Sequence, residues 1–325
     1  MKSKRGTGEL VPTFYFDRND IMDMNFHRNS RTVQTFLHSA SEGYMKYRVV
    51  INRESGSVPD HADERFSQLA ERLGIQCEID LADSATLQST LAHANRQMGP
   101  DDRLIVWGGD GTIACALSQQ TDSSPALIAL PGGTMNLLHK RMYGDDLEIE
   151  TILTNSVHHG IEKKLPCGII QGERFYVGAL FGRLTQLAKA REATRHIDPI
   201  GAVAEIVNAD GLLDLTPELA LYTSGENIYR TSTLGVFVGD HVDTDLEVGI
   251  FSSDSIFDLT SIAVESLISD WRTANGVEYI LTKSLDIDCS KNHPINMTLD
   301  GEIRELEGPL RLEFVRDSGR VITTQ

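Results

Sequence analysis

The residues of this chain that could do chemistry fall into glycine-containing loops and acidic turns. The most distinctive loop follows the apolar run 104–107, which predicts a strand buried on both faces. The segment 112–120 contains no Gly or Pro, and it predicts the start of a helix. A strand, a glycine turn and a helix N-terminus together bind phosphate, because unpaired N–H groups and the positive helix end face the anion. The loop consists of Gly108, Gly109, Asp110, Gly111 and Thr112.

Two more loops repeat this arrangement. The loop 131–136 follows the apolar run 126–130, and the loop 52–57 follows the strand-like run 48–51. The carboxyl ends of parallel strands lie at one edge of a sheet, where open α/β folds bind ligands, so we expect the three loops to meet there. Ordinary strand-to-helix turns are the alternative, but they need neither an acid among the glycines nor a hydroxyl residue after each glycine cluster. The further candidate phosphate-binding residues are Asn52, Gly133, Thr134 and Asn136.

The elements around these loops predict two domains after an extension. From Tyr47 onward, strand-like and helix-like segments alternate, which is typical of an α/β domain with a parallel sheet. From about Leu165 the pattern changes to short strands and turns, which predicts a β-rich, sandwich-like domain. Two helices are expected within it, at 184–195 and 256–272. The predicted parts are an extension at 1–44, an α/β nucleotide-binding domain at 45–164 and a β-rich substrate domain at 165–309, with 310–325 returning to complete the first domain.

Composition narrows the classes of function. The chain has 325 residues, 40% of them hydrophobic, and a net charge of −17. The negative charge argues against nucleic acid as a partner. The four cysteines form no C-x-x-C pair, as expected for reduced core residues of a cytoplasmic protein. No apolar run reaches the ~18 residues of a membrane span, and no apolar segment follows the basic start, so we expect neither a span nor a signal peptide.

The spacing of the loops resembles one known family. Gly108–Thr112 and then 131–136 match the GGDGT and P-x-GT-x-N motifs of the diacylglycerol kinase catalytic domain. Residues 52–56 resemble its opening N-P-x-S-G, with Arg53 in place of Pro. GGDGT alone is shared with NAD kinases and sphingosine kinases, and the second motif favours the lipid kinases. The resemblance covers about 47–315, and it implies transfer of the γ-phosphate of ATP, with Mg²⁺, to a lipid hydroxyl, with diacylglycerol as the expected acceptor.

The resemblance also implies a catalytic base. The sequence 300–302 is similar to the D-G-E motif near the end of lipid kinases, where an acid is taken to deprotonate the lipid hydroxyl. Asp300 and Glu302 stand two positions apart, so on an extended chain they would share a face, and the sequence does not choose between them. Alone, such a turn is usually solvated. Asp110 has two readings: it orients Mg²⁺, which we slightly favour, or it shapes its loop by accepting amide hydrogen bonds.

A second acidic cluster is a candidate metal site. In bacterial lipid kinases a D-D-G-x-L-D segment before a strand holds a structural Mg²⁺. Here the resemblance assigns the ligand places to Asp240, Asp243 and Asp245, with Thr244 where the family has Gly. Closely spaced oxygen ligands suit Mg²⁺. A solvated acidic loop is the alternative.

Departures from the family pattern keep other functions open. After P-x-GT-x-N the family commonly has Asp-Phe-Ala-Arg, whereas this chain has 137–140, Leu-Leu-His-Lys. The alternatives are an NAD or sphingoid-base kinase of the same superfamily, or a non-catalytic nucleotide- or lipid-binding relative. The expected partners are ATP and a lipid, met by transient contact with a membrane surface, and no nucleic acid; a homodimer stays open. The expected place is the cytoplasm, peripheral to the membrane, in phospholipid biosynthesis.

Overall fold

The computed structural model describes most of the chain after residue 44. The described residues between 45 and 324 belong to one compact unit. They are 45–145, 148–182, 184–185, 219–223, 226–239, 245–251, 272, 277–289 and 294–324. The two helices predicted in the second domain therefore lie outside the described residues, apart from 184, 185 and 272.

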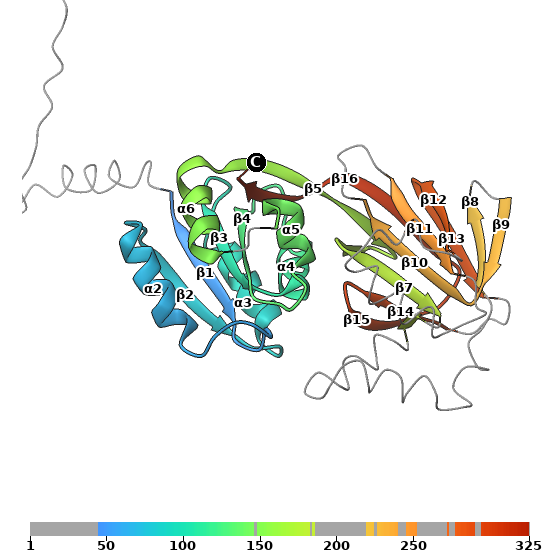
Figure 1. Cartoon of the computed structure of the whole chain (residues 1–325), viewed down its shortest axis with the longest axis horizontal. Helices are drawn as coiled ribbons and strands as arrows, with labels where there is room; N and C mark the ends of the chain where they lie inside the picture. Colours follow the sequence, from blue (N-terminus) through green and yellow to red (C-terminus); the bar gives the residue numbers. More distant parts are fainter. Residues whose placement is uncertain are drawn as a thin grey trace, which may run out of the picture. The chain divides into compact units, whose positions relative to one another are not determined.

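The first part of the unit alternates strands and helices (Figure 1). Strands β2, β1, β3 and β4 lie in that order, and all their pairings are parallel. The elements are β1 (Tyr47–Asn52), α2 (Ala62–Arg72), β2 (Cys77–Ala82), α3 (Leu87–Arg96), β3 (Arg103–Gly108), α4 (Asp110–Ser118), β4 (Ala126–Pro131), α5 (Leu137–Tyr143) and α6 (Ile149–His159).

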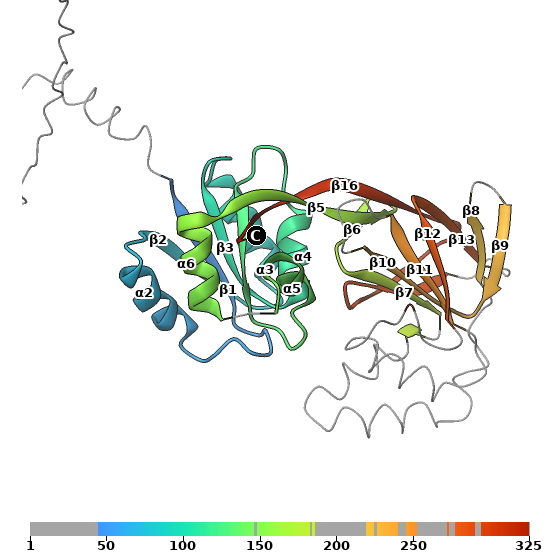
Figure 2. The same cartoon turned by 45° about the horizontal axis from the view of Figure 1, so that its top comes forward.

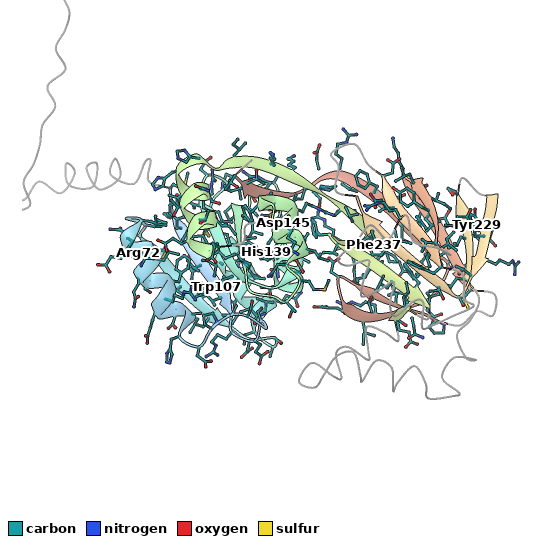
Figure 3. The ribbon with its side chains drawn as sticks, in the orientation of Figure 1. Arg72, Trp107, His139, Asp145, Tyr229 and Phe237 are labelled. Atoms are coloured by element: carbon teal, nitrogen blue, oxygen red, sulfur yellow. The ribbon has the colours of Figure 1, made fainter. Side chains whose placement is uncertain are left out.

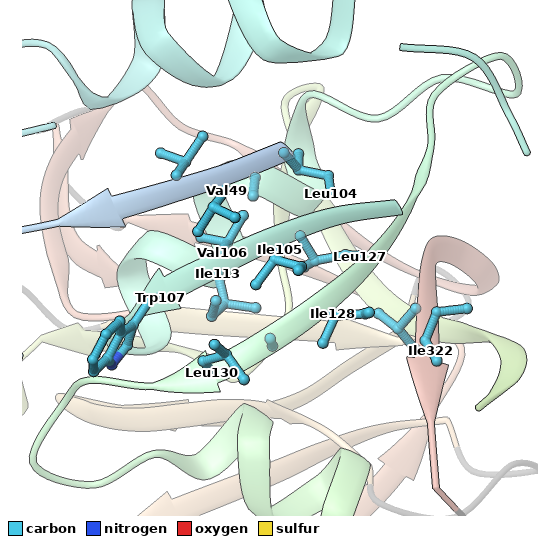
Figure 4. Packing of buried hydrophobic residues seen from close by; sticks show 14 of the residues in the cluster. Val49, Leu104, Ile105, Val106, Trp107, Ile113, Leu127, Ile128, Leu130 and Ile322 are labelled. Carbon is cyan, nitrogen blue, oxygen red and sulfur yellow. The ribbon is translucent and has the colours of Figure 1, made fainter. Parts of the chain in front are cut away.

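The two central strands form the core of this sheet. Every residue of β4 is buried, as is every residue of β3 after Arg103, because helices cover both faces of a parallel sheet. Figure 4 shows the apolar side chains of these strands packed against one another and against Ile113 of α4. At the end of β3 the buried Trp107 donates its Nε1–H to the carbonyl of Pro131, at 3.0 Å. The core therefore fixes the two points at which the loops leave the sheet.

The second part is β-rich, and two sheets share its core. One is the ten-stranded sheet that continues from the first part, and it contributes buried residues such as Leu221 and Ile287. The other is a six-stranded antiparallel sheet, and it contributes residues such as Phe181 and Met297. An α/β domain with a parallel sheet followed by a β-rich domain is the predicted fold class, which is confirmed. The strands are β5 (Ile161–Ile170), β6 (Glu173–Phe175), β7 (Gly178–Gly182), β8 (Leu219–Thr223), β9 (Glu226–Thr231), β10 (Thr233–Val238), β11 (Leu246–Phe251), β12 (Val277–Thr282), β13 (Ser284–Cys289), β14 (Ile295–Leu299), β15 (Glu302–Leu306) and β16 (Leu310–Thr323).

Strand β16 belongs to both parts. It pairs with β13 near its beginning and with β5 along most of its length. Strands β5 and β16 run side by side in both Figure 1 and Figure 2. Near its end Val321 pairs in parallel with Leu127 of β4. The register shifts between Val315 and Gly319, at a bulge that increases the local twist. The exact domain boundaries at 164/165 and 309/310 stay predictions.

None of the helices in the described ranges is both long and apolar enough to cross a bilayer.

Candidate active site

The first two predicted loops contact each other through hydroxyl groups. Asn52, at the end of β1, donates its Nδ2–H to Thr112 Oγ1 at 2.9 Å. Ser55 Oγ lies 3.3 Å from the same oxygen, and it accepts the N–H of Gly109 at 3.2 Å. Ser55 was not among the candidate residues, although it lies in the loop that contains Asn52. These bonds fix the N-terminus of α4 against the end of β1.

The third loop is bonded to the other two. The N–H of Gly132 donates to the carbonyl of Gly108 at 2.9 Å, and Ser57 contacts both the Gly132 and Gly133 carbonyls. Asn136 closes the loop on itself, because its Oδ1 accepts the N–H of Gly133 and its Nδ2–H donates to the carbonyl of the same residue, each at 2.9 Å. The expectation that the three loops meet at one edge of the sheet is therefore confirmed.

The glycines of these loops serve two different purposes. A Cβ on Gly132 would lie 2.9 Å from the Cα of Gly108, and a Cβ on Gly133 would lie 2.8 Å from the Cα of Gly109. These positions require glycine because one loop touches the other. At Gly111, by contrast, a Cβ would meet nothing within 4 Å. The open space of the site therefore lies beside Gly111.

Gly111 stands in the first turn of α4. This helix begins at Asp110, two residues earlier than predicted, with Gly109 as an extended N-cap. An acid in the first turn favours a helix start, which explains the difference. The amides of Asp110, Gly111 and Thr112 have no acceptor within the helix, because a helix leaves its first N–H groups unpaired. These amides and the helix dipole border the open space, where they could hold an anion.

Asp110 joins this turn to the next helix. Its Oδ2 accepts the N–H of Leu137 at 3.0 Å and its Oδ1 accepts the N–H of Leu138 at 2.8 Å. The carboxylate thus caps α5, in which the N-cap Asn136 adopts a left-handed conformation with φ 52° and makes no side-chain cap bond. The amides that Asp110 accepts come from the neighbouring helix rather than from its own loop. Its role toward Mg²⁺ stays a prediction.

His139 lies inside the α/β part (Figure 3). Its side chain is fully buried. Its Nδ1 lies 3.9 Å from Asp110 Oδ1. Burial lowers the pKa of His139, and the charge of Asp110 opposes that effect. This burial was not predicted from the sequence, although Leu138, Met142 and Tyr143 share the buried helical face with His139.

Arg141, on the same helix, reaches into the β-rich part. Its Nη1–H donates to the carbonyl of Tyr176 at 3.0 Å, and its Nη2–H donates to the carbonyl of Val238 at 2.5 Å. Its acceptors are main-chain atoms far along the chain, so no residue type in the sequence predicts these contacts.

Asp300 occupies a tight turn between β14 and β15. Asp300 and Gly301 have φ 48° and φ 91°, as expected for the Asp-Gly of a two-residue hairpin. Its Oδ2 accepts the N–H of Tyr176 at 2.7 Å, and its Oδ1 accepts those of Val177 and Gly178 at 2.8 and 3.0 Å. The turn is therefore not a freely solvated one.

The environments of the two candidate bases differ. Burial raises the pKa of Asp300 to about 6, while three amide hydrogen bonds lower it and the negative charge of Asp110 raises it further. The electrostatic effect of Asp110 links this carboxyl group to the phosphate-loop region. Glu302 is exposed and pairs with Arg304 at 2.7 Å. The shared face expected for the two acids assumed an extended chain, whereas the chain turns between them.

The predicted metal site is only partly within the described residues. Asp240 and Asp243 lie outside them, and Asp245 directly precedes β11. The part of the chain that the structure describes contains no group of three or more His, Cys, Asp or Glu suited to a metal ion. The neighbouring Glu247 is buried and pairs with Arg272. The assignment of these aspartates to Mg²⁺ therefore stays a prediction.

Comparisons with known proteins agree with this geometry. Residues 46–167 match the family model described as the diacylglycerol kinase catalytic domain. The fold is similar to that of a diacylglycerol kinase from Bacillus anthracis str. Sterne, with a TM-score of 0.59, 14% identity, and coverage of 86% of this chain and 96% of that one. Two further solved structures from the same strain give TM-scores of 0.63 and 0.61, each at 16% identity, covering 86% of this chain and 97% of theirs.

Proposed function

We propose that this chain is a lipid kinase that transfers the γ-phosphate of ATP to a lipid hydroxyl. The match of residues 46–167 to the diacylglycerol kinase catalytic domain supports this proposal. The expected acceptor is diacylglycerol. The observation that carries the proposal is the open space beside Gly111, bordered by the first-turn amides of α4. An anionic phosphate chain fits this donor set, because backbone N–H groups and a helix N-terminus stabilise negative charge.

In this proposal Asp300 rather than Glu302 is the base. A base that works near neutral pH benefits from a pKa raised toward that range, and burial gives Asp300 a pKa of about 6. Glu302 is instead exposed and paired with Arg304. Asp300 would take the proton of the lipid hydroxyl, the lipid oxygen would form a bond to the γ-phosphorus, and the bond from that phosphorus to the departing ADP would break.

The proposed transfer also needs a divalent ion, and Mg²⁺ prefers oxygen ligands. We assign it to Asp110 beside the phosphates and to Asp240, Asp243 and Asp245 as a structural site. When bound, Mg²⁺ neutralises charge on the phosphate oxygens. A lipid substrate further implies a cytoplasmic enzyme that touches a membrane surface transiently, and a homodimer is part of the same proposal.

The decisive test is a transfer assay with several acceptors. Purified protein with γ-labelled ATP and Mg²⁺ should label diacylglycerol in mixed vesicles, and leave NAD and sphingosine unlabelled. Asp300→Asn should lower kcat about 10²- to 10⁴-fold, the usual contribution of a general base. Labelled NAD phosphate or sphingosine phosphate without a labelled diacylglycerol product would refute the acceptor. Nucleotide binding without any transfer would indicate a non-catalytic relative.

Gly111→Ala tests the phosphate site separately. The added methyl group enters open space, so the fold should be retained, and Ala is favoured over Gly within a helix. The same methyl group narrows the space for phosphate, so KM for ATP should rise about tenfold, as a small misplacement at a reacting site does. An unchanged KM for ATP would indicate that the nucleotide phosphates do not bind beside the first turn of α4.

A further inference from the structure

We propose that Arg141 positions Asp300 for proton transfer, by holding the peptide carbonyl of Tyr176 in place. The inference rests on the proposed function, because Arg141 has this role only if Asp300 takes the proton. Arg141 lies outside the motif residues of the loops, and its carbonyl acceptors Tyr176 and Val238 lie in the β-rich part. It acts through the main chain that holds the carboxylate.

The guanidinium group of Arg141 fixes two segments of the β-rich part at once. It donates to the carbonyls of Tyr176 and Val238, at 3.0 and 2.5 Å. The same two segments are joined by a bond from the N–H of Val238 to the carbonyl of Val177, at 3.1 Å. The charged donor and the main-chain bond together hold residues 176–178 against the end of β10.

The held segment is the one that binds Asp300. The N–H groups of Tyr176, Val177 and Gly178 donate to its carboxylate at 2.7 to 3.0 Å, and the N–H of Asp300 donates back to the carbonyl of Gly178 at 2.9 Å. Tyr176 is therefore bound on both sides, since its C=O accepts from Arg141 and its N–H donates to Asp300. A shift of Tyr176 would displace the carboxylate of Asp300.

The opposite end of α5 is bonded to the phosphate-loop region. Asp110 accepts the amides of Leu137 and Leu138 at the start of the helix, and Arg141 leaves the helix in its last turn. A helix of this length spans about 10 Å and behaves as one rigid piece. Helix α5 thus sets the position of Asp300 relative to the turn that holds Gly111, so that a base and a phosphate bound there come into register.

This task suits arginine better than lysine. Two carbonyls are held at once, which a planar group with several N–H donors can do and a single ammonium group does less well. Arg141→Lys keeps the charge and removes the two-armed contact. It therefore separates positioning from a general effect of positive charge, and it serves as the second variant if Arg141→Met fails to fold.

The test is a kinetic comparison at several pH values in the full chain. Arg141→Met and Arg141→Lys should lower kcat by about ten- to a hundredfold, since a misplacement of about 1 Å has such effects, with KM for ATP nearly unchanged. A weaker hold on 176–178 loosens the amide bonds that lower the pKa of Asp300. The acid limb of kcat should therefore move to higher pH. Among the described residues, Asp110 of α4 and Cys167 of β5 interact electrostatically with Asp300, and both are unchanged in these variants.

A double variant shows whether Arg141 acts through Asp300. In an Asp300→Asn background, Arg141→Lys should cause little further loss, because the group that it positions is already gone. Arg72→Met is the matched control: it removes an exposed arginine that bridges α2 and α6 through Glu150, and kcat should not change. Thermal unfolding of each variant confirms that it is folded.

The outcomes separate this inference from the proposed function. Full turnover by Asp300→Asn would refute the assignment of Asp300 as the base, and with it the positioning role of Arg141. A large loss in Asp300→Asn together with unchanged kcat in both Arg141 variants would refute the positioning role alone. Losses that multiply in the double variant, or a rise in KM for ATP without a change in kcat, would also overturn it.

Discussion

The regions around Asp110 and Asp300 share one type of hydrogen bonding but differ in their surroundings. In each, a carboxylate from one segment accepts consecutive amides of another segment, Leu137 and Leu138 in the first case and 176–178 in the second. Around Asp110 the backbone is dense, because glycines let the loops touch. Around Asp300 the carboxylate stands on a half-buried turn residue and accepts amides from inside the protein.

The difference shows how a protein can place two acids near one site with separate tasks. A carboxylate that caps a helix in a closely packed loop region is suited to holding shape. A buried carboxylate whose pKa rises to about 6 is suited to exchanging a proton near neutral pH. We therefore expect packing to dominate the stability of the first region and charge to dominate that of the second.

The largest effect is expected from a methyl group in the packed region. Gly133→Ala puts a Cβ 2.8 Å from the Cα of Gly109, so the backbone must move, and we expect a loss of about 3 kcal/mol in the free energy of unfolding. Gly301→Ala meets nothing within 4 Å but must adopt φ 91°, which costs about 1 kcal/mol. Urea unfolding measures both. Equal losses would show that packing does not distinguish the regions.

A second test compares two substitutions of acid by amide. Asp110→Asn leaves an amide N–H of α5 facing an NH₂ group, which should cost about 2 kcal/mol. The pKa of Asp300 is raised from 3.8 to about 6, so the folded state is favoured by its protonation at low pH, and this contribution is lost as pH rises through 6.

At pH 7.5 Asp300→Asn therefore also removes an unfavourable buried charge, and it should cost less than about 1 kcal/mol. Urea unfolding at pH 7.5 gives both values. If Asp300→Asn were the more destabilising of the two, its carboxylate would be mainly a structural acceptor.

A third and smaller effect is the pH dependence of turnover. A base with a pKa of about 6 is protonated below that value, so kcat should fall about tenfold for each pH unit below 6. An ordinary aspartate, with a pKa of about 3.9, would keep nearly full activity to about pH 5. The measurement is kcat from pH 4.5 to 8 at saturating ATP. Full activity at pH 5 would contradict the assignment of Asp300 as the base.

The sequence predicted the phosphate-loop region well because its signals are local. Glycines and hydroxyl residues after apolar strands have one physical meaning in a parallel sheet, and the contact of Asn52 with Thr112 follows from that topology. The sequence did not predict the contacts that are not local. Gly132 and Gly133 are glycines because of a neighbouring loop, which no spacing within one loop reveals.

The surroundings of Asp300 could not be predicted from the sequence. Its first acceptor contact is with Tyr176, 124 positions away, and the amides involved carry no residue-type signal. The D-G-E letters therefore identified the turn without saying what held its carboxylate. Likewise, the burial of His139 depends on how α5 packs. The neighbouring Lys140 and Arg141 suggest a solvated segment instead.

The long strand β16 has a consequence for how the protein is made. The buried Tyr143 hydroxyl donates to the carbonyl of Ile322, 179 positions later, and the edge of β4 is covered only when Val321 arrives. During synthesis the edge of β4 therefore stays uncovered until the ribosome has made almost all of the β-rich part. An open apolar edge invites pairing with other chains, so we expect nascent molecules to need protection by chaperones during this interval.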